Sequence, residues 1–423
     1  MKISDLKKFK KILILGYGIE GQATSRFLNK FVPNSEIIIA DEKIDGANFL
    51  KKQDHSNLVI KTPGINKEVI TKPYTTATNI FFANIDINKT IGVTGTKGKS
   101  TTTALLNQVL RQNRLKTALL GNIGKPMLDV ITAGKSIDWY IIELSSYQLD
   151  DIKYSPHIAA VINIYPEHQN YHANFNQYLD AKLNIARFQN KNDFFFFNPK
   201  FGKLVQFAKS LPSKARSFAK PTPFVTGSKN LRGKHNYENI KVVYHIAKLL
   251  GLPDGKIKSA IASYRGLPHR MQEIGEYEGI CFVNDSAATN PESAIAAIKS
   301  LKKVDTVILG GLNRGYDFTK LVRSVFNSHV RNIILFPDSD TEIEKLLGCE
   351  KKPLQTVYRT NSMSRAVLLA YQKTKPGYIC LLSPGSPSYY SFKNFPDRGQ
   401  KFIYWVKRYA KAFKKENSST EKR

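Results

Sequence analysis

The residues with the clearest capacity for chemistry lie in one run, Thr94–Thr101, which reads TGTKGKST. The run follows an apolar stretch that we expect to be a strand, and it precedes a helical pattern. In such a loop the backbone N–H groups surround phosphate oxygens, Lys99 reaches the outer phosphates, and Ser100 or Thr101 binds Mg²⁺. The early glycine of the usual motif stands at Gly92, one position too soon. The run therefore predicts a nucleotide-phosphate site that departs from the standard phosphate loop.

A second glycine-rich loop, Gly16–Gly21, follows the apolar run Lys11–Leu15 and fits the pattern G-x-G-x-x-G. Asp41 closes the next apolar run, at the distance that a dinucleotide-binding fingerprint requires. Taken alone, this pattern indicates an NAD-dependent enzyme. The same geometry serves any nucleotide diphosphate at a helix N-terminus, and it also serves as a tight turn without a ligand. All three interpretations stay open at this point.

Three further side chains are candidates for metal or phosphate chemistry. Glu143 lies near the end of the apolar run Trp139–Leu144, where a carboxylate beside a phosphate loop is well placed to bind Mg²⁺. His168 is a possible metal ligand, although a lone histidine serves equally well as a hydrogen-bonding group in a loop. Lys182 lies on an expected helix, and its residue type alone predicts a surface lysine.

Polar loops also follow the expected strands in the last third of the chain. They are Leu267–Arg270, Asn284–Pro291, Gly310–Gly315 and Ser383–Ser388. Each loop by itself could be only a turn. Because ligands bind at the carboxyl ends of parallel strands, several such loops together indicate one binding face.

The elements that must hold these loops are short apolar runs that alternate with helical patterns. The runs are Lys11–Leu15, Glu36–Ala40, Leu58–Lys61, Thr90–Thr94, Trp139–Leu144, Ile158–Ile164, Asp193–Phe197, Gly279–Asn284, Asp305–Gly310, Arg331–Phe336 and Tyr378–Ser383. Near-continuous apolar strands between helices predict an α/β protein with parallel sheets buried on both faces. We expect three domains, over residues 1–89, 90–266 and 267–423, with disorder from about residue 414.

Composition narrows the class of protein. The chain has 423 residues and three cysteines, without a close Cys-x-x-Cys pair, which predicts neither a disulfide framework nor a zinc site. No apolar stretch is long enough for a signal peptide or a membrane span, so we expect a cytoplasmic protein without a membrane partner. The net charge of +30 would suit a nucleic acid. Because lysine is spread along the whole chain, we interpret the charge as compositional and expect no nucleic-acid partner.

Taken together, the motifs resemble those of the Mur ligases, in the family's order and over nearly the whole chain. The most specific marks are Thr94–Thr101, Glu143–Leu149, the spacing of His168 and Lys182, Leu267–Arg270, Asn284–Pro291 and Ser383–Gly399. The resemblance implies three domains: a Rossmann-like domain that binds a UDP-linked substrate, a central ATPase domain, and a Rossmann-like C-terminal domain that binds the amino acid and part of the nucleotide.

The resemblance also implies roles for individual residues. The UDP-linked substrate would contact Gly18, Ile19, Glu20, Asp41, Thr62, Gly64 and Asn122. ATP would contact Gly95, Thr96, Lys97, Gly98, Lys99, Ser100, Thr101, Asn239, Arg270 and Asp285. The catalytic residues would be Lys99, Glu143, His168 and Lys182, and two Mg²⁺ ions would be held by Ser100, Glu143, His168 and a carbamylated Lys182. D-glutamate would contact Thr289, Arg314, Ser388 and Phe395.

The activity implied by this resemblance is the ATP-dependent addition of D-glutamate to UDP-N-acetylmuramoyl-L-alanine, through an acyl phosphate, in the synthesis of peptidoglycan precursors. The protein would act as a monomer. Ala287 and Tyr390 stand where the family commonly has Lys and Asp, close to the expected amino-acid site. The alternatives are a Mur-type or folylpolyglutamate-type ligase with another acceptor and, more distantly, an NAD-dependent dehydrogenase.

Overall fold

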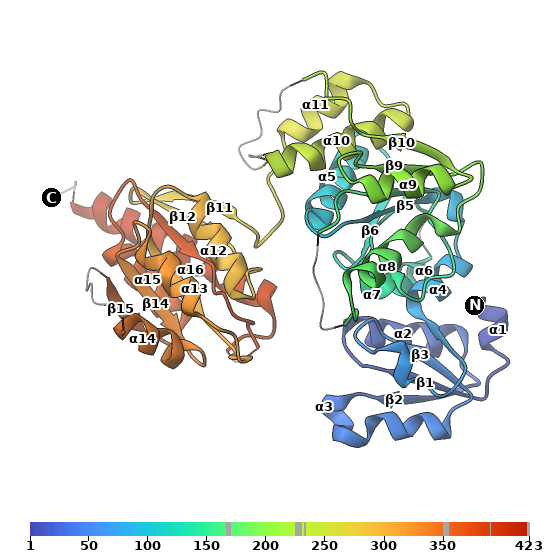
Figure 1. Ribbon diagram of the computed structural model, residues 1–423. Coiled ribbons are helices and arrows are strands. Elements are labelled where there is room, and N and C mark those ends of the chain that lie inside the picture. Colours follow the sequence, from blue (N-terminus) through green and yellow to red (C-terminus); the bar gives the residue numbers. More distant parts are fainter. Residues whose placement is uncertain are drawn as a thin grey trace. The chain divides into compact units, whose positions relative to one another are not determined.

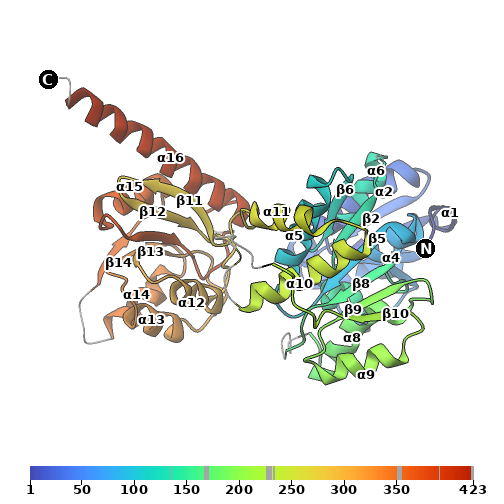
Figure 2. The ribbon, with the colours of Figure 1, turned by 90° about the horizontal axis from the view of Figure 1, so that it is seen from above.

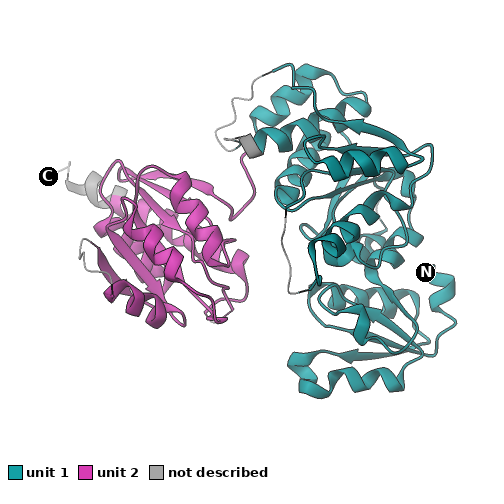
Figure 3. Ribbon diagram, in the orientation of Figure 1, with its two compact units in different colours: residues 1–264 teal, residues 265–423 magenta. Residues whose placement is uncertain are grey.

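The computed structural model describes residues 1–134, 136–165, 171–224, 231, 234–349, 355–389 and 391–420. The chain forms two compact units, residues 1–264 and 265–423, which Figure 3 shows in teal and magenta. The first unit contains two sheets and the second contains one (Figure 1). The predicted class, α/β with largely parallel sheets, is confirmed.

The N-terminal sheet of the first unit has the strand order β2-β1-β3-β4, and all its strands are parallel. Its strands are β1 (Lys11–Leu15), β2 (Glu36–Ala40), β3 (Leu58–Lys61) and β4 (Tyr74–Thr76). The helices around it are α1 (Ile3–Leu6), α2 (Ile19–Phe31), α3 (Glu42–Asp45) and α4 (Ala77–Ala83), with 3-10 turns η1 (Gly46–His55), η2 (Lys67–Val69) and η3 (Ile87–Lys89).

The second sheet of this unit is also parallel and has the order β10-β9-β8-β5-β7-β6. Its strands are β5 (Thr90–Thr94), β6 (Thr117–Gly121), β7 (Trp139–Glu143), β8 (Ile158–Val161), β9 (Phe194–Phe197) and β10 (Lys214–Ser217). Its helices are α5 (Lys99–Gln112), α6 (Met127–Ala133), α7 (Ser146–Leu149), α8 (Phe175–Arg187), α9 (Gly202–Ser210), α10 (Lys234–Leu249) and α11 (Asp254–Ala262). Helices α5, α10 and α11 pack on one face, and α6 to α9 pack on the other.

One hydrophobic core connects the two sheets of the first unit, because side chains of β1 and α2 pack in the same cluster as those of β6, β7 and α6. Polar contacts add to it. Arg26 on α2 forms an ion pair with Asp129 on α6 at 2.8 Å, and Lys61 on β3 forms one with Asp151 at 2.7 Å. Lys61 is only 1% exposed. Separating the two partners of this buried pair would leave an uncompensated charge, which is costly. The ion pair therefore helps to fix the position of the N-terminal sheet relative to the second sheet.

The sheet of the second unit has the order β11-β12-β16-β13-β14-β15. Its strands are β11 (Gln272–Tyr277), β12 (Ile280–Asn284), β13 (Val304–Gly310), β14 (Asn332–Phe336), β15 (Thr356–Arg359) and β16 (Ile379–Leu382). Helices α12 (Pro291–Ser300), α13 (Thr319–Phe326) and α14 (Asp340–Gly348) cover one face, while α15 (Met363–Lys373) and α16 (Phe395–Thr420) cover the other. Figure 2 shows these layers on the two sides of the sheet.

Two features of the fold differ from the expectations. Strand β11 pairs with β12 in the antiparallel direction, so the third sheet is not wholly parallel. Helix α16 ends at Thr420, beyond the point near residue 414 from which disorder is expected. Among the described helices, none is both long and apolar enough to cross a bilayer.

Candidate active site

The phosphate loop connects β5 to α5, and its backbone conformation depends on glycine. Gly98 precedes the first residue of α5 and has a φ of +86°. A Cβ added at Gly98 would lie 2.3 Å from Oδ1 of Asn239, so a side chain at this position would collide with α10. The first N–H groups of α5 have no acceptor within the helix, and this favours an anion at the loop.

Side chains from neighbouring elements hold this loop in place. Oδ1 of Asn163 accepts hydrogen bonds from the backbone N–H groups of Thr96 and Lys97, at 3.1 and 2.9 Å. The hydroxyl of Tyr178 donates to Oγ1 of Thr96 at 3.0 Å. Lys99 extends back over the loop, where Nζ donates to the carbonyl oxygens of Gly95 and Thr96, both at 3.0 Å. The loop is therefore preorganised, and the sequence analysis missed Asn163 and Tyr178.

Lys182 lies under the same loop. It belongs to α8, is 1% exposed, and donates from Nζ to the carbonyl oxygen of Gly95 at 2.9 Å and to Oγ1 of Thr94 at 3.4 Å. Its amine lies 4.8 Å from the ring centroid of Tyr178. The expectation of a surface lysine, drawn from its residue type, is wrong, because the turn before α8 and the helix register direct this side chain inward.

Glu143 ends β7, the strand next to β5, and its carboxylate is fully buried at the edge of the sheet where the phosphate loop begins. Oε1 accepts a hydrogen bond of 2.9 Å from the side-chain amide of Asn122. Oε2 is buried without a hydrogen-bond partner among the described residues. A buried carboxylate oxygen together with the hydroxyl of Ser100 fits a hard cation such as Mg²⁺. The predicted ligand His168 lies outside the described residues.

The residues expected to contact a UDP-linked substrate line one cavity of the first unit, with a volume of about 600 Å³. They are Gly18, Ile19, Glu20, Asp41, Thr62, Gly64 and Asn122. The cavity lies at the carboxyl ends of β1, β2 and β3. Residues of the second sheet and of the helix that follows β7 complete it: Gly121 ends β6, and Ser145 and Gln148 belong to the start of α7 and to α7 itself. The expected contact at Asn122 already implied a contribution from the region of the second sheet.

The glycine loop of this cavity has the close contacts that its sequence predicts. A Cβ at Gly16 would lie 2.1 Å from Oγ1 of Thr62, and one at Gly21 would lie 2.2 Å from the carbonyl oxygen of Gly16. Oδ2 of Asp41 accepts a hydrogen bond of 2.6 Å from the N–H of Tyr17. The glycines thus permit the tight turn and the close packing of helix on strand.

In the second unit the polar loops after β12, β13 and β16 meet, as the sequence analysis expects. Arg398, which is 1% exposed, connects all three loops. Its guanidinium donates to the carbonyl oxygens of Ser286 and Ser386, both at 3.0 Å, and to that of Gly310 at 3.5 Å. Burial lowers the pKa of Arg398 to about 9. Arg398 was not among the individual residues predicted for the site, although it lies within the stretch Ser383–Gly399.

Asp285 follows β12 and is also buried. Oδ2 accepts a hydrogen bond of 2.8 Å from the hydroxyl of Ser383, and Oδ1 accepts one of 3.1 Å from the N–H of Met271. Burial raises the pKa of Asp285 to about 6, although these hydrogen bonds and the charge of Arg270 oppose the rise. The loss of hydration at the sheet edge therefore disfavours the ionised form of Asp285.

The four residues expected to bind D-glutamate lie in the second unit at or near these loops. Ser388 is buried, Phe395 is 39% exposed at the start of α16, and the hydroxyl of Ser286 donates to the carbonyl oxygen of Phe395 at 2.8 Å. Thr289 is half-buried, and Arg314 is exposed with its guanidinium 6.0 Å from the ring centroid of Tyr389. Of the expected nucleotide contacts, Asn239 belongs to the first unit, and Arg270 and Asp285 belong to the second.

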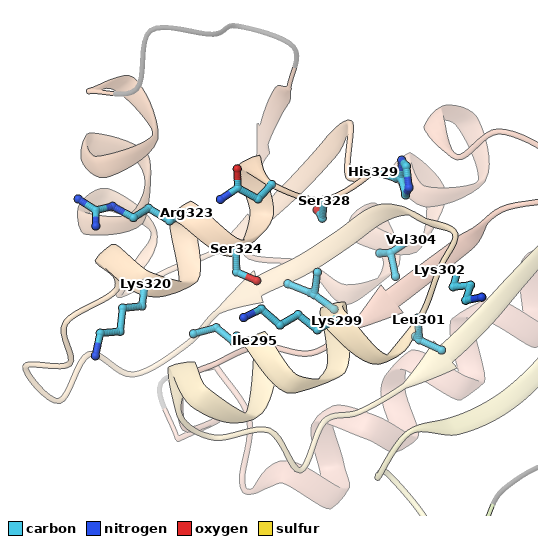
Figure 4. A pocket seen from close by; sticks show the side chains of 12 residues that line it. Ile295, Lys299, Leu301, Lys302, Val304, Lys320, Arg323, Ser324, Ser328 and His329 are labelled. Atoms are coloured by element: carbon cyan, nitrogen blue, oxygen red, sulfur yellow. The ribbon is translucent and has the colours of Figure 1, made fainter. Parts of the chain in front are cut away.

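Another cavity in the second unit, of about 750 Å³, lies between α12 and α13 (Figure 4). Its rim carries Lys299, Lys302, Lys320, Arg323 and His329 over an apolar floor. None of the residues expected to bind substrate lines it. The candidate active site is therefore in the loops already described.

Comparisons with known proteins agree with this geometry. Family models match residues 93–260, as the Mur ligase middle domain, and residues 269–385, as the Mur ligase glutamate ligase domain. The UDP-N-acetylmuramoylalanine--D-glutamate ligase of Lactobacillus acidophilus is 31% identical over 96% of this chain and 99% of its own length. The chain belongs to the Mur ligase family. The corresponding ligase of Geobacillus kaustophilus is 29% identical over 95% of this chain and 98% of its own length.

Solved structures of other proteins share the fold. The UDP-N-acetylmuramate-alanine ligase MurC of Thermotoga maritima has a TM-score of 0.58 at 17% identity, and the match covers 95% of this chain and 99% of that one. Escherichia coli FolC in complex with ADP has a TM-score of 0.58 at 15% identity, over 79% and 94% of the two chains. At these identities the likeness concerns the fold alone. Membership of the Mur ligases decides against an NAD-dependent dehydrogenase.

Proposed function

We propose that this Mur ligase joins D-glutamate to UDP-N-acetylmuramoyl-L-alanine in the synthesis of peptidoglycan precursors, as a cytoplasmic monomer that converts ATP to ADP and phosphate. The curated relatives in the comparison carry that activity in their names and align over nearly the full length of the chain. The phosphate loop with Lys99 supports the use of ATP.

The observation that carries the proposal is the continuity between the two candidate sites of the first unit. The cavity lined by the glycine loop includes Asn122, and Asn122 donates a hydrogen bond to Glu143 at the edge of the ATPase sheet. A substrate whose UDP moiety lies in the cavity would extend toward the phosphate loop. This continuity supports a transfer of phosphoryl from ATP to the far end of a UDP-linked acid.

The proposed reaction has two chemical steps. A carboxylate oxygen of the substrate attacks the γ-phosphorus of ATP, ADP leaves, and an acyl phosphate forms. The amine of D-glutamate then attacks the acyl carbon, phosphate leaves, and the nitrogen loses a proton as the amide forms. Lys99 and the N–H groups at the start of α5 neutralise the charge that develops on the transferred group.

Glu143 and Ser100 would hold Mg²⁺, with His168 as a further ligand. Bound Mg²⁺ supplies positive charge beside the phosphates during transfer. We further propose that Lys182 becomes a carbamate and thereby supports a second Mg²⁺. Its buried position under Gly95 supports a function at the phosphate loop in place of a solvent-exposed one.

The amino acid would bind in the second unit, at Thr289, Arg314, Ser388 and Phe395. Arg314 would receive a carboxylate of D-glutamate, since a guanidinium binds a carboxylate through two parallel hydrogen bonds. The exposed position of Arg314 supports this role because its donors face solvent and not the core.

A panel assay tests the proposal. Phosphate release is measured with ATP, UDP-N-acetylmuramoyl-L-alanine and one of D-glutamate, L-glutamate, L-lysine or L-alanine. D-glutamate should give the highest kcat/KM by at least two orders of magnitude. A site that pairs two carboxylates rejects L-lysine and L-alanine, which have one, and a site built for one configuration at Cα rejects L-glutamate. Faster turnover with L-lysine or L-glutamate would contradict the acceptor and leave the ligase class intact.

A further inference from the structure

Glu20 is an acidic residue at a place where the substrate is expected to bring a second anion. It lies in the first turn of α2, directly after the glycine loop, and it lines the cavity proposed for the UDP-linked substrate. A diphosphate at a glycine loop approaches the N-terminus of the following helix. An ionised Glu20 would face that diphosphate with a charge of the same sign, and this repulsion opposes substrate binding.

Solvent does not offset the charge of an ionised Glu20, because one of its carboxyl oxygens is buried. Oε2 accepts a hydrogen bond of 3.2 Å from the side-chain amide of Gln148 on α7, and Oε1 is buried without a hydrogen-bond partner in the described part of the chain. An anionic oxygen without a donor is costly in such a position, whereas a protonated carboxyl can direct its own O–H outward.

The charged groups around Glu20 do not supply a full counter-charge. Lys61 on β3 is the cation that acts on Glu20, but its amine is paired with Asp151 at 2.7 Å and donates to the carbonyl oxygen of Ile65 at 3.0 Å. From β2 and α3 the cavity receives Asp41, Glu42 and Lys43, two acids and one base. Burial consequently raises the pKa of Glu20 to about 7, against the hydrogen bond from Gln148 and the charge of Lys61.

We propose that Glu20 takes up a proton when the diphosphate of the UDP-linked substrate enters this cavity, so that its carboxyl donates a hydrogen bond to the phosphate and substrate binding weakens as the pH rises. This inference rests on the proposed function, because it assigns the cavity to a UDP-linked substrate. It makes Glu20 a specificity-determining residue that couples binding to pH.

The size of the change in apparent Kd follows from the fraction of the protein in which Glu20 is protonated. If only the protonated form binds, the apparent Kd equals the intrinsic Kd divided by the protonated fraction. With a pKa of about 7, that fraction falls from about 0.9 at pH 6 to about 0.1 at pH 8. The apparent Kd should therefore rise about tenfold over this interval. A diphosphate that is esterified at both ends does not titrate here, so the change belongs to the protein.

Isothermal titration calorimetry tests the inference on the full chain. UDP-N-acetylmuramoyl-L-alanine is titrated at pH 6, 7 and 8, each time in two buffers of different ionisation enthalpy, which measures the protons taken up on binding. The wild-type protein should take up close to one proton at pH 8 and show the tenfold change in Kd. Glu20→Gln, which keeps the shape and a donor, should bind with little dependence on pH and without proton uptake.

Glu42→Gln is the matched control, because Glu42 lines the same cavity on a different element. It should keep the proton uptake of the wild type. Wild-type binding without proton uptake, or uptake that persists in Glu20→Gln, would overturn the inference and leave the proposed function in place. A wild-type protein that does not bind this substrate at any pH would overturn the proposed function, and the inference with it. If the variant fails to fold, the absence of proton uptake by the wild-type protein still overturns the inference.

Discussion

The side-chain amide of Asn122 donates a hydrogen bond of 2.9 Å to Oε1 of Glu143, so the ends of the neighbouring strands β6 and β7 share one carboxylate. Oε2 of the same carboxylate is the atom without a hydrogen-bond partner in the described part of the protein. The contact thus orients one oxygen and leaves the other for a ligand.

Replacement of Glu143 should separate these two roles. Glu143→Ala should lower kcat by two or more orders of magnitude and raise the Mg²⁺ concentration needed for half-maximal activity, because a carboxylate ligand is lost. Asn122→Ala should have a smaller effect, mainly on KM for the UDP-linked substrate. Steady-state kinetics over a range of Mg²⁺ concentrations measure both. An unchanged Mg²⁺ requirement in Glu143→Ala would contradict its assignment as a ligand.

Lys182→Ala should abolish most activity, because the variant cannot form a carbamate under the phosphate loop. Bicarbonate should not restore it, whereas a short-chain acid such as propionate should restore part of it by supplying a carboxylate in the vacated space. Lys191→Ala, at an exposed lysine just beyond α8, serves as the control and should be fully active. Wild-type rates in Lys182→Ala would rule out the carbamate.

Gly98→Ala tests the close approach of the phosphate loop to α10. Its Cβ would lie 2.3 Å from Oδ1 of Asn239, at a φ of +86° that side chains rarely adopt. We expect a loss of about 1–3 kcal/mol in the free energy of unfolding and no increase in melting temperature on addition of ATP. Gly202→Ala is the matched control, since Gly202 begins α9 and has open space around its Cβ position. It should be neutral or slightly stabilising. Equal effects of the two substitutions would argue against the steric explanation.

Asp285 gives a dependence of stability on pH. Its pKa in the folded protein is about 6, above the ordinary value of 3.8, so the folded state binds a proton more tightly than the unfolded state. The associated stability is fully present below about pH 4 and is lost as the pH rises through 6. At pH 8 the ionised carboxylate costs about 2–3 kcal/mol.

Asp285→Asn should avoid this cost and be more stable than the wild type at pH 8, with about a third of that difference at pH 4.5. Urea unfolding at the two pH values measures the change. Activity should fall in the variant, since the carboxylate is expected to face the nucleotide. The same stability difference at both pH values would show that ionisation of Asp285 is not the cause.

Local sequence was enough to predict the strands that are buried on both faces and the loops that follow them. Strands β1, β2, β3 and β5 begin and end at the predicted residues, because each is a continuous apolar run closed by Gly, Asp or Thr. The strands that were missed, such as β4 and β10, are short and lie at sheet edges. Residues there need no apolar pattern, so the sequence carries no signal for them.

The phosphate loop and the glycine loop were also determined locally. The spacing of glycines in the sequence predicts where the backbone adopts a positive φ or where a neighbour leaves no room for a side chain. Gly16 and Gly98 are examples. The residue types of Lys99 and Ser100, next to a strand, then predict phosphate chemistry without knowledge of the rest of the fold.

Only the tertiary structure decided which distant side chains join these loops. Lys182 contacts Gly95 across 87 positions of sequence, Asn163 contacts Thr96 across 67, and Arg398 contacts Ser286 across 112. The residue types of these partners are ordinary for a surface, and their burial depends on helix register and on the order of strands in the sheet. The contact of Glu20 also depends on the tertiary structure, because its hydrogen bond from Gln148 requires that the two sheets share one core. Hydrophobic periodicity specifies each element and its buried face, but the packing of one element against another sets the contacts of a polar side chain, and these contacts set its charge.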